Sequence, residues 1–440
     1  ALPTSVKPAP SEDAPSLREL QREARAIARE AILHEPVFNR ATRALDRVFL
    51  HPIAGPLVLA AILFLIFQAV FSWSAGPMAL IEAAAAGLGD AVATSLPDGW
   101  VKSLITEGVI AGVGSVIVFL PQILILFSFI LLLEASGYMA RAAFLMDELM
   151  MRVGLNGRAF IPLLSSFACA IPGIMAARVI DSERDRLTTI MIAPLMTCSA
   201  RLPVYTLIIA AFIPPSAVGA FNLQGLVMFG LYIFGVISAV TVAFVLKRTV
   251  TKGAAQPLMM ELPTYKLPDF RDFAVGLLTR ASAFLKRAGT IILATSVMLW
   301  FLASYPSTAG DLRSTYAGRI GSVLETVLAP IGFNLEIAIA LVPGMAAREV
   351  AVGALGTVYA IQNAEENTEG LAAVLQSAWT LPTALAFLAW YVFAPQCFAT
   401  LATVRRETNS WRWTAFAFSY LMLLAYAGAG VTYWLASALL

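Results

Sequence analysis

The fold of this chain is decided by one stretch, residues 165–178, which reads SSFACAIPGIMAAR. It lies within a run without charged residues, from Ala159 to Ala177, that is apolar enough for a membrane interior. The run contains Pro172 and Gly173, and a proline removes a backbone donor while a glycine loosens the helix. Irregular backbone at membrane depth survives only where protein or a water-filled cavity covers it. We therefore predict an interrupted or re-entrant segment that lines something polar.

The same pattern recurs in the second half of the chain. Three short motifs occur in both halves in the same order. Gly-Leu-Asn at 154–156 returns as Gly-Phe-Asn at 332–334, PGIMAAR at 172–178 returns as PGMAAR at 343–348, and APLMTC at 193–198 returns as APQC at 394–397. The alternative is chance, because Ala, Pro and Gly are common here. Paired, interrupted apolar segments in two halves point to the binding site of a transporter. We therefore predict an internal duplication with helix breaks on the transport path at Pro172, Gly173, Pro194, Pro343, Gly344 and Pro395.

The composition places the chain in a membrane. Of its 440 residues, 59% are hydrophobic and 13% are charged, about half the charge of a soluble protein. Several charge-free runs exceed the ~20 residues that a helix needs to span a bilayer. The expected fold class is an all-α polytopic membrane protein with two inverted repeats of broken or re-entrant helices. No basic stripe with interleaved aromatic residues is present, which argues against a nucleic-acid partner.

Apolar and polar segments divide the chain into six regions. We expect a disordered tail at 1–15, a cytoplasmic amphipathic helix and linker at 16–50, a first span with an extracytoplasmic segment at 51–107, a first repeat at 108–246, a cytoplasmic linker at 247–287 and a second repeat at 288–440. The uninterrupted or singly broken spans within them are Pro52–Ile81, Gly108–Leu133 with a break at Pro121, Phe221–Leu246, Ala288–Ser304 and Trp413–Leu440.

Basic residues set the expected orientation. The positive-inside bias places the basic segments and the N-terminus in the cytoplasm. These segments are residues 36–50, 134–158, 178–186, 247–287 and 405–412. The assignment is self-consistent only if residues 158–178 enter and leave the membrane on the cytoplasmic side and residues 334–350 on the outer side. The two halves would then be inverted, as in alternating-access carriers.

Sulfur gathers near the predicted breaks. Cys198 and Cys397 each follow a proline in matching positions of the two halves. A proline frees backbone carbonyl groups one turn earlier, so each break offers a thiol beside unpaired oxygens. Sulfur suits transition metals rather than Mg²⁺ or Ca²⁺. The alternative is that each cysteine is a small buried hydrophobic side chain. We predict that these two cysteines face one another near the bilayer midplane.

Four further sulfur or acid side chains could join a metal site. Met175 and Met345 stand in the two echoed motifs, while Cys169 has Ala340 as its counterpart, which weakens Cys169 as a shared ligand. An acid within a spanning region is a functional hypothesis by default, so Glu349 is a candidate ligand. Glu349 could equally form a structural ion pair with an arginine.

The other polar groups of the apolar segments suggest structural roles. We expect Arg178, Arg201 and Arg348 to donate hydrogen bonds to the carbonyl groups freed at the breaks. Residues 87–90 match the Gly-x-Gly-Asp pattern of intramembrane aspartyl proteases, but no span contains the second aspartate that this chemistry needs. No zinc-protease or phosphate-loop motif is present. We expect no catalytic and no cofactor-binding residues.

Several long motifs resemble one known family. They are FLPQ at 119–122, LEASGYMARAAF at 133–144, FACAIPG at 167–173, MTCSARLP at 196–203 and MAAREV at 345–350. They closely resemble the membrane domain of the ferrous iron transport protein B (FeoB) family, and the likeness covers about residues 45–437. The resemblance implies Gate-type segments in the bacterial inner membrane and Fe(II) as the transported substrate.

The resemblance also implies a cytoplasmic GTPase domain, which would bring GTP and Mg²⁺, followed by a small helical domain. The nucleotide motifs do not occur here, so we interpret the chain as a fragment in which residues 16–32 resemble the end of that helical domain. The implied partners are the lipid bilayer, the GTPase domain and small FeoA- or FeoC-type proteins, and a homo-oligomer is left open. The alternative function is a Gate-type carrier of nucleosides or another small solute. That carrier would need polar side chains to recognise a base and a ribose, where the breaks offer Cys, Met and Ser.

Overall fold

The structure is a computed structural model that describes residues 22–23, 26–27, 40–167, 169–218, 221–252, 263–306, 315–346, 348, 350–359, 368–395 and 397–439. The chain divides into two compact units, residues 1–48 and 49–440. In the first unit, the described parts of the predicted amphipathic helix are helical, and helix α2 (Arg40–Phe49) follows. The tail predicted at 1–15 lies outside the described residues.

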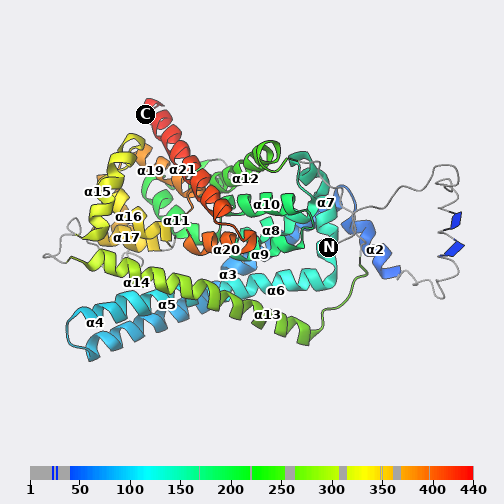
Figure 1. Ribbon diagram of the computed structural model, residues 1–440, viewed down its shortest axis with the longest axis horizontal. Helices are drawn as coiled ribbons and strands as arrows, with labels where there is room; N and C mark the ends of the chain where they lie inside the picture. Colours follow the sequence, from blue (N-terminus) through cyan, green and yellow to red (C-terminus); the bar gives the residue numbers. More distant parts are fainter. Residues whose placement is uncertain are drawn as a thin grey trace, which may run out of the picture. The chain divides into compact units, whose positions relative to one another are not determined.

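The second unit is built from helices (Figure 1). In chain order they are α3 (Ala54–Ser95), α4 (Trp100–Ser103), α5 (Ala111–Val118), α6 (Leu120–Ser136), α7 (Tyr138–Val153), α8 (Phe160–Ser166), α9 (Ala170–Ala176), α10 (Glu183–Ile192), α11 (Leu202–Phe212), α12 (Leu223–Thr249), α13 (Phe270–Phe284), α14 (Thr290–Ser304), α15 (Tyr316–Leu328), α16 (Leu335–Ala346), α17 (Val350–Val358), α18 (Thr368–Ala378), α19 (Leu381–Phe393), α20 (Phe398–Thr408) and α21 (Trp411–Leu439). The strands among the described residues are β1 (Ala217–Val218) and β2 (Phe221–Asn222), which pair antiparallel.

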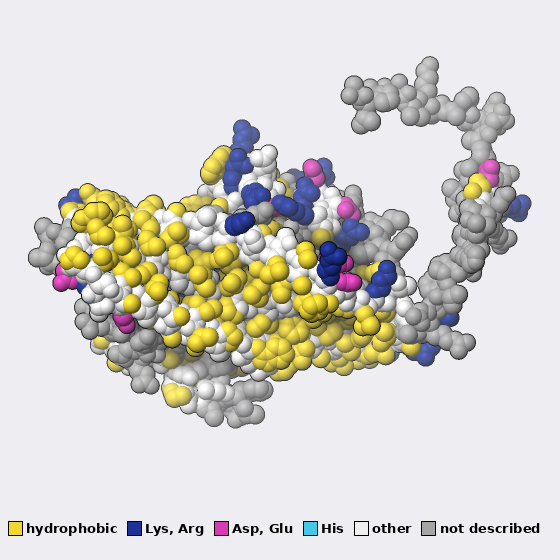
Figure 2. Space-filling view, turned by 90° about the horizontal axis from the view of Figure 1, so that it is seen from below, with side chains coloured by type: hydrophobic (Ala, Val, Ile, Leu, Met, Phe, Trp, Pro, Cys, Tyr) yellow, Lys and Arg dark blue, Asp and Glu magenta, His cyan; other side chains and the backbone are white. Residues whose placement is uncertain are grey.

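Helix length and composition confirm a multi-pass membrane protein. Among the described residues, five helices are long and apolar enough to cross a membrane, or up to seven if each of two sharply bent pairs counts as one span. Hydrophobic side chains cover much of the described surface seen in Figure 2, while most Lys and Arg side chains lie in its upper middle and right-hand part. Such a belt is what a helical bundle presents to lipid. The bends of 111° and 114° in the two pairs confirm that broken helices are part of the fold.

Two predicted spans differ from the observed helices. Helix α3 continues to Ser95, well past the predicted end at Ile81, because the chain beyond it is rich in alanine, the best helix former. The break predicted at Pro121 occurs two residues earlier, at Phe119 between α5 and α6. Pro121 stands in the first turn of α6, where a backbone N–H would have no partner within the helix, so its absence costs the helix no hydrogen bond.

The second half of the predicted cytoplasmic linker is helical. Helix α13 passes through a π-helical turn, Leu285–Gly289, directly into α14, so the chain has no loop between the linker and the next span. Helices α3, α5, α6, α13 and α14 pack beside one another, as Figure 1 shows below the remaining helices of this unit. Residues 270–287 of the predicted linker therefore belong to a bundle of long helices.

The echoed motifs at 154–156 and 332–334 build the same local structure. Both glycines adopt left-handed φ angles, 85° and 81°, after a helix end. The following residue donates its N–H to the carbonyl five residues earlier in both copies, at 2.9 and 3.3 Å. Both asparagine side chains then accept a backbone N–H of the next helix at 2.9 Å. These are a helix C-cap followed by an N-cap, so the echo reflects one structural unit that occurs twice.

Candidate functional site

The opening stretch folds into a helical hairpin. Helix α8 packs against α9, and a side-chain carbon added at Gly173 would overlap Ser166 and lie 2.7 Å from the carbonyl oxygen of Pro162. At the open end of the hairpin, Arg158 pairs with Asp181. The two ends of the segment therefore lie together, as a re-entrant segment requires.

The break in this hairpin is not at the Pro-Gly pair. Helix α8 ends at Ser166 and α9 begins at Ala170, so the break spans residues 167–169. Pro172 stands in the first turn of α9, where backbone N–H groups have no helical partner and a proline fits. Gly173 is required for the close approach of the two helices. Pro172 therefore lies at the start of α9, and Gly173 allows α9 to pack against α8. The prediction that Pro172 and Gly173 interrupt a helix was wrong.

A second hairpin is formed by α16 and α17. Gly344 packs close to α17, because an added side-chain carbon would lie 3.3 Å from Cβ of Ala351. At the open end, the Tyr359 hydroxyl group accepts from Trp379 Nε1 at 2.8 Å, and the Asn334 side chain lies close to this hydroxyl group. Pro343 lies inside α16, and the helix runs on to Ala346. The predicted break at Pro343 and Gly344 is therefore also displaced, here toward the C-terminal side.

Pro194 and Pro395 do mark breaks. Pro194 stands in a short 3₁₀ turn, Ala193–Leu195, after which the chain is extended until the next helical turn at Ser199. Pro395 lies between the end of α19 and the start of α20. Cys198 and Cys397 are the extended residues that precede these helical turns, and their carbonyl groups accept the first backbone hydrogen bonds, at 3.1 and 3.0 Å. The two cysteines thus hold equivalent positions in the two halves.

Two buried arginines donate hydrogen bonds to carbonyl groups at these breaks. Arg201 has no exposed surface and donates to the carbonyl oxygens of Pro194 at 2.9 Å and Leu195 at 3.5 Å. Arg348 is 4% exposed and donates to the carbonyl oxygen of Ala394 at 3.4 Å and to Sγ of Cys198 at 3.3 Å. These contacts confirm the carbonyl-binding role predicted for both arginines.

Arg178 behaves differently, although its motif matches that of Arg348. Its guanidinium group forms a two-pronged ion pair with Glu407, at 2.6 and 2.7 Å, and is more than half exposed. The prediction that it binds a freed carbonyl group was wrong. The reason is its position at the open end of the first hairpin, away from the breaks at Pro194 and Pro395.

The sulfur candidates do not form one group. Cys397 packs with Cys169 and Met175 around the buried side chains of Ile171 and Ala399. Cys198 is buried elsewhere, against the Arg348 guanidinium group.

Among the described residues, no three His, Cys, Asp or Glu side chains are grouped closely enough to hold a metal ion. Met345 is half-buried in α16, and Glu349 lies outside the described residues. The facing of Cys198 and Cys397 stays a prediction.

The sequence analysis did not identify two polar side chains that lie near the Pro194 break. Thr197 and Tyr205 are fully buried near Arg201, and neither hydroxyl group has a hydrogen-bond partner among the described residues. Thr197 belongs to the echoed motif, which is a usable signal. Tyr205 stands in an ordinary apolar run and gives no signal.

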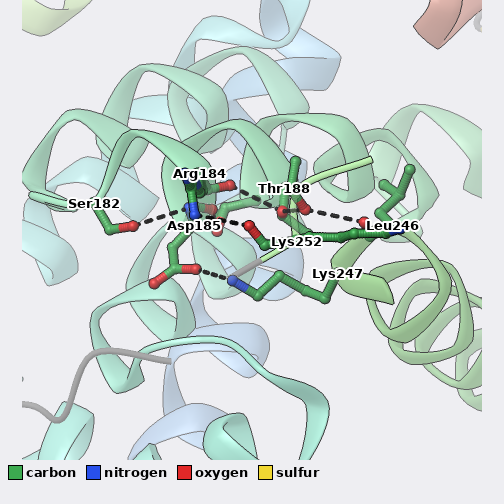
Figure 3. A network of polar contacts seen from close by, with 9 residues as sticks. Ser182, Arg184, Asp185, Thr188, Leu246, Lys247 and Lys252 are labelled. Carbon is green, nitrogen blue, oxygen red and sulfur yellow. Dashed lines mark hydrogen bonds and ion pairs between the residues drawn. The ribbon is translucent and has the colours of Figure 1, made fainter. Parts of the chain in front are cut away.

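A second missed feature is a polar network between α10 and α12 (Figure 3). Asp185 and Lys247 form an ion pair whose side chains are 1% and 7% exposed. Beside it, the hydroxyl groups of Thr188 and Thr251 lie 2.8 Å apart, and Arg184 donates to the carbonyl of Lys252 at 2.8 Å. The network ties the start of α10 to the end of α12, and α10 leads directly into the Pro194 break.

Two family profiles match the chain. The Gate family, described as nucleoside recognition, matches residues 116–212 and 285–411, and the ferrous iron transport protein B C-terminal family matches residues 228–280. With the paired hairpins and matched breaks, these findings define a polytopic membrane protein of the Gate class. Within that class, the chain belongs to the ferrous iron transport protein B family.

Curated relatives agree with this assignment. The Fe(2+) transporter FeoB of Leptospira interrogans serovar copenhageni is 42% identical over 431 residues, which are 92% of this chain and 61% of the relative. That of Leptospira biflexa is 43% identical over 411 residues, 89% of this chain and 60% of the relative. That of Staphylococcus aureus strain COL is 40% identical over 394 residues, covering 87% and 57%. The chain thus spans about three fifths of the length of the relatives it matches. No solved structure matches it.

Proposed function

We propose that this chain takes up ferrous iron across the inner membrane of a bacterium. The observation that carries the proposal is its identity of 42%, across 92% of the chain, to a protein named as an Fe(2+) transporter. The fold is compatible with this role, since re-entrant hairpins in two halves are the usual setting of a carrier's binding site. Fe(II) is then the transported substrate, and the chain itself carries out no catalysis.

The proposed path runs past the two breaks that carry cysteines. Cys198 and Cys397 would offer sulfur, and the carbonyl groups near Pro194 and Pro395 would offer oxygen. A transported ion must bind well enough to enter and weakly enough to leave, and two sulfurs with carbonyl oxygens give such an intermediate site. A closed cage of four thiolates would hold the metal instead. Cys169, Met175, Met345 and Glu349 are secondary contributors along the same path.

The proposed orientation is that of an inverted duplication. The repeats are residues 108–246 and 288–440, the hairpin at 158–178 opens to the cytoplasm, the hairpin at 334–350 opens outward, and the N-terminus is cytoplasmic. The charge bias and the contacts between the two ends of each hairpin support this arrangement. Single cysteines introduced at positions 158 and 335 should react with impermeant maleimide from opposite sides. Labelling of both from one side would contradict the inversion.

GTP and partner proteins form the regulatory part of the proposal. We assign GTP and Mg²⁺ to the family's GTPase domain, which would dock on the cytoplasmic segments at 16–50 and 247–287. One relative, from Porphyromonas gingivalis, is named as a fusion of Fe(2+) transport protein A with FeoB and is 38% identical over 431 residues. This supports a small protein of the FeoA type as a second partner on the same face.

Uptake by purified protein in liposomes tests the function. Radioactive Fe(II) should accumulate in vesicles, while labelled nucleosides should not; the opposite result would favour the nucleoside carrier. In the full-length transporter, replacing both Cys198 and Cys397 by serine should abolish Fe(II) uptake at matched expression. Unchanged uptake in that double variant would remove the cysteines from the path and leave the carbonyl groups of the hairpins as the site.

A further inference from the structure

Helices α9 and α20 begin alike and pack against each other (Figure 1). Cys169 is the extended residue before α9, with a φ angle of −156°, and Cys397 is the extended residue before α20, with a φ angle of −162°. Ile171 and Ala399, each two residues further along, form one buried cluster, and both cysteines pack against it. The starts of the two helices, with their thiols, therefore lie together.

The opposite ends of the two helices show that they run in parallel. Arg178, just after α9, pairs with Glu407 in the last turn of α20, at 2.6 and 2.7 Å. These two residues are 229 positions apart in sequence. Within one position, the same spacing separates the two residues of the buried cluster and the two cysteines. The helices keep one register along their length, so the two cysteines stand at the same level of the pair.

The two thiols lie deep in the membrane part of the chain. At ~1.5 Å per helical residue, Cys169 lies roughly 14 Å from Arg178 along the helix. The Arg178 side chain is more than half exposed and, in the proposed orientation, marks the cytoplasmic end. The hydrocarbon core of a bilayer is about 30 Å thick, which places both cysteines near its middle. A reagent that reaches them must be small and uncharged, because charge is costly at this depth.

The packing of this pair suits a disulfide bond. A disulfide needs Cα atoms about 4.4–6.8 Å apart. Packed helices keep their axes about 8–10 Å apart, and facing backbone atoms come closer than the axes do, most of all beside a side chain as small as Ala399. Cys169 and Cys397 are thiols in the structure, and both are partly exposed. Cys198 differs, because it is buried and its Sγ accepts a hydrogen bond from Arg348.

The geometry points to a redox-sensitive dithiol, in which Cys169 and Cys397 form a disulfide that joins the starts of α9 and α20. The oxidant belongs to the class of small uncharged peroxides. Hydrogen peroxide oxidises one thiol to a sulfenic acid, and its second oxygen leaves as water. The other thiol then attacks this sulfur, so the S–S bond forms while the S–O bond breaks and a second water leaves. Across both steps the peroxide takes up two electrons and two protons from the thiols, and a dithiol reductant returns them.

The bridge stops transport in two ways, and this consequence rests on the proposed function. It ties α9 of the first hairpin to the helix that follows the Pro395 break, so the two halves lose freedom to move against each other, and alternating access needs such movement. It also takes the Cys397 sulfur off the proposed metal path, because a metal binds the thiolate. Oxidation then closes the path, and reduction opens it.

Counting thiols in the purified chain in lipid nanodiscs tests the bridge. After treatment with hydrogen peroxide and denaturation, the three thiols of the parent chain should fall to one, and mass spectrometry should find the peptides of Cys169 and Cys397 joined. Cys198→Ser, the matched control, should form the same bridge and keep no thiol. Cys169→Ser and Cys397→Ser should each keep both remaining thiols. Reductant should restore every lost thiol, which separates the bridge from irreversible oxidation.

The parent chain alone decides whether the bridge forms, so the test does not depend on how well the serine variants fold. Three thiols left in the folded parent chain, under conditions that oxidise the unfolded chain, would overturn the inference. A bridge that contains Cys198 would overturn it as well, because the register of α9 and α20 pairs only the other two cysteines.

Fe(II) uptake tests the consequence for transport. Once the peroxide has been removed, uptake into liposomes by the parent chain should fall in proportion to the bridged fraction and return after dithiothreitol. A bridge that leaves uptake unchanged would overturn the control of transport. Absence of uptake by the fully reduced chain would count against the proposed function, and the thiol count would still decide whether the bridge forms.

Discussion

The buried ion pair between Asp185 and Lys247 should be among the most sensitive points of the fold. Its side chains are 1% and 7% exposed, so water screens neither charge. Removing one partner leaves the other charge buried without compensation, which costs about 3–5 kcal/mol in comparable pairs. We expect this loss in the free energy of unfolding for Asp185→Asn and for Lys247→Met. Met keeps the aliphatic stem that packs against Gly154.

The double variant distinguishes an ion pair from two separate packing effects. With both charges gone, no unpaired charge remains, and replacement of whole buried pairs is often neutral. The double variant should therefore lose less than the sum of the single losses, by about 1–3 kcal/mol. Unfolding in mixed micelles, followed by circular dichroism, gives the four free energies of this cycle. As a control, Arg152→Met breaks the exposed pair with Glu148, whose side chains are 73% and 77% exposed, and should cost less than ~1 kcal/mol.

Additive single losses would refute the reasoning, and so would a single variant as stable as the parent chain. Helix α10 connects the pair directly to the Pro194 break, which lies on the proposed metal path. A single variant that still folds should lose Fe(II) uptake in liposomes more than the double variant does. Equal uptake in all four proteins would show that the network supports the fold alone.

The remaining predictions concern glycines at close contacts. Gly173→Ala should destabilise the chain by about 1–3 kcal/mol through overpacking, because the added carbon overlaps Ser166, and adding Ser166→Ala should recover part of the loss in thermal unfolding. Gly332→Ala should cost more than Gly154→Ala in the same assay. At both positions, the left-handed φ angle costs an alanine about 1 kcal/mol. Only at Gly332 does the added carbon also overlap a neighbour, which is the ring of Tyr433. Equal losses at the two glycines would contradict this.

The membrane class and two of the four proline breaks could be predicted from sequence. Pro194 and Pro395 interrupt helices as expected, whereas Pro172 and Pro343 lie within helices. A proline lacks one backbone N–H donor, and this donor is missed only where a helical hydrogen bond would need it. The effect of a proline therefore depends on how far it lies from the start of the helix. That start is set by tertiary packing, such as the fit of Gly173 against α8, and tertiary packing is not encoded in a local pattern.

The pairings of the site could not be predicted in the same way. Asp185 and Lys247 are 62 residues apart, and the charged turn around Asp185 resembles an ordinary solvated loop in sequence. The three cysteines all precede helices, yet Cys397 packs with Cys169 and Met175 while Cys198 contacts an arginine. Matching sequence positions predicted equivalent backbone structure, which the structure confirms. They did not predict equivalent neighbours, because neighbours depend on how distant helices pack.

The two copies of the arginine motif show how the same short sequence can acquire two different environments. Local sequence determines the helix end that carries Arg178 or Arg348, and the two ends are nearly identical in sequence. What each arginine meets is determined by another element: α20 presents Glu407 to the first, and the end of α19 presents the carbonyl of Ala394 to the second. A carboxylate pairs with the first arginine at the exposed end of a hairpin, whereas the second arginine contacts a sulfur and a carbonyl oxygen in the interior. The difference between the two arginines therefore arises from packing, and a substitution at Glu407 should lower the free energy of unfolding without changing the contact between Arg348 and Cys198.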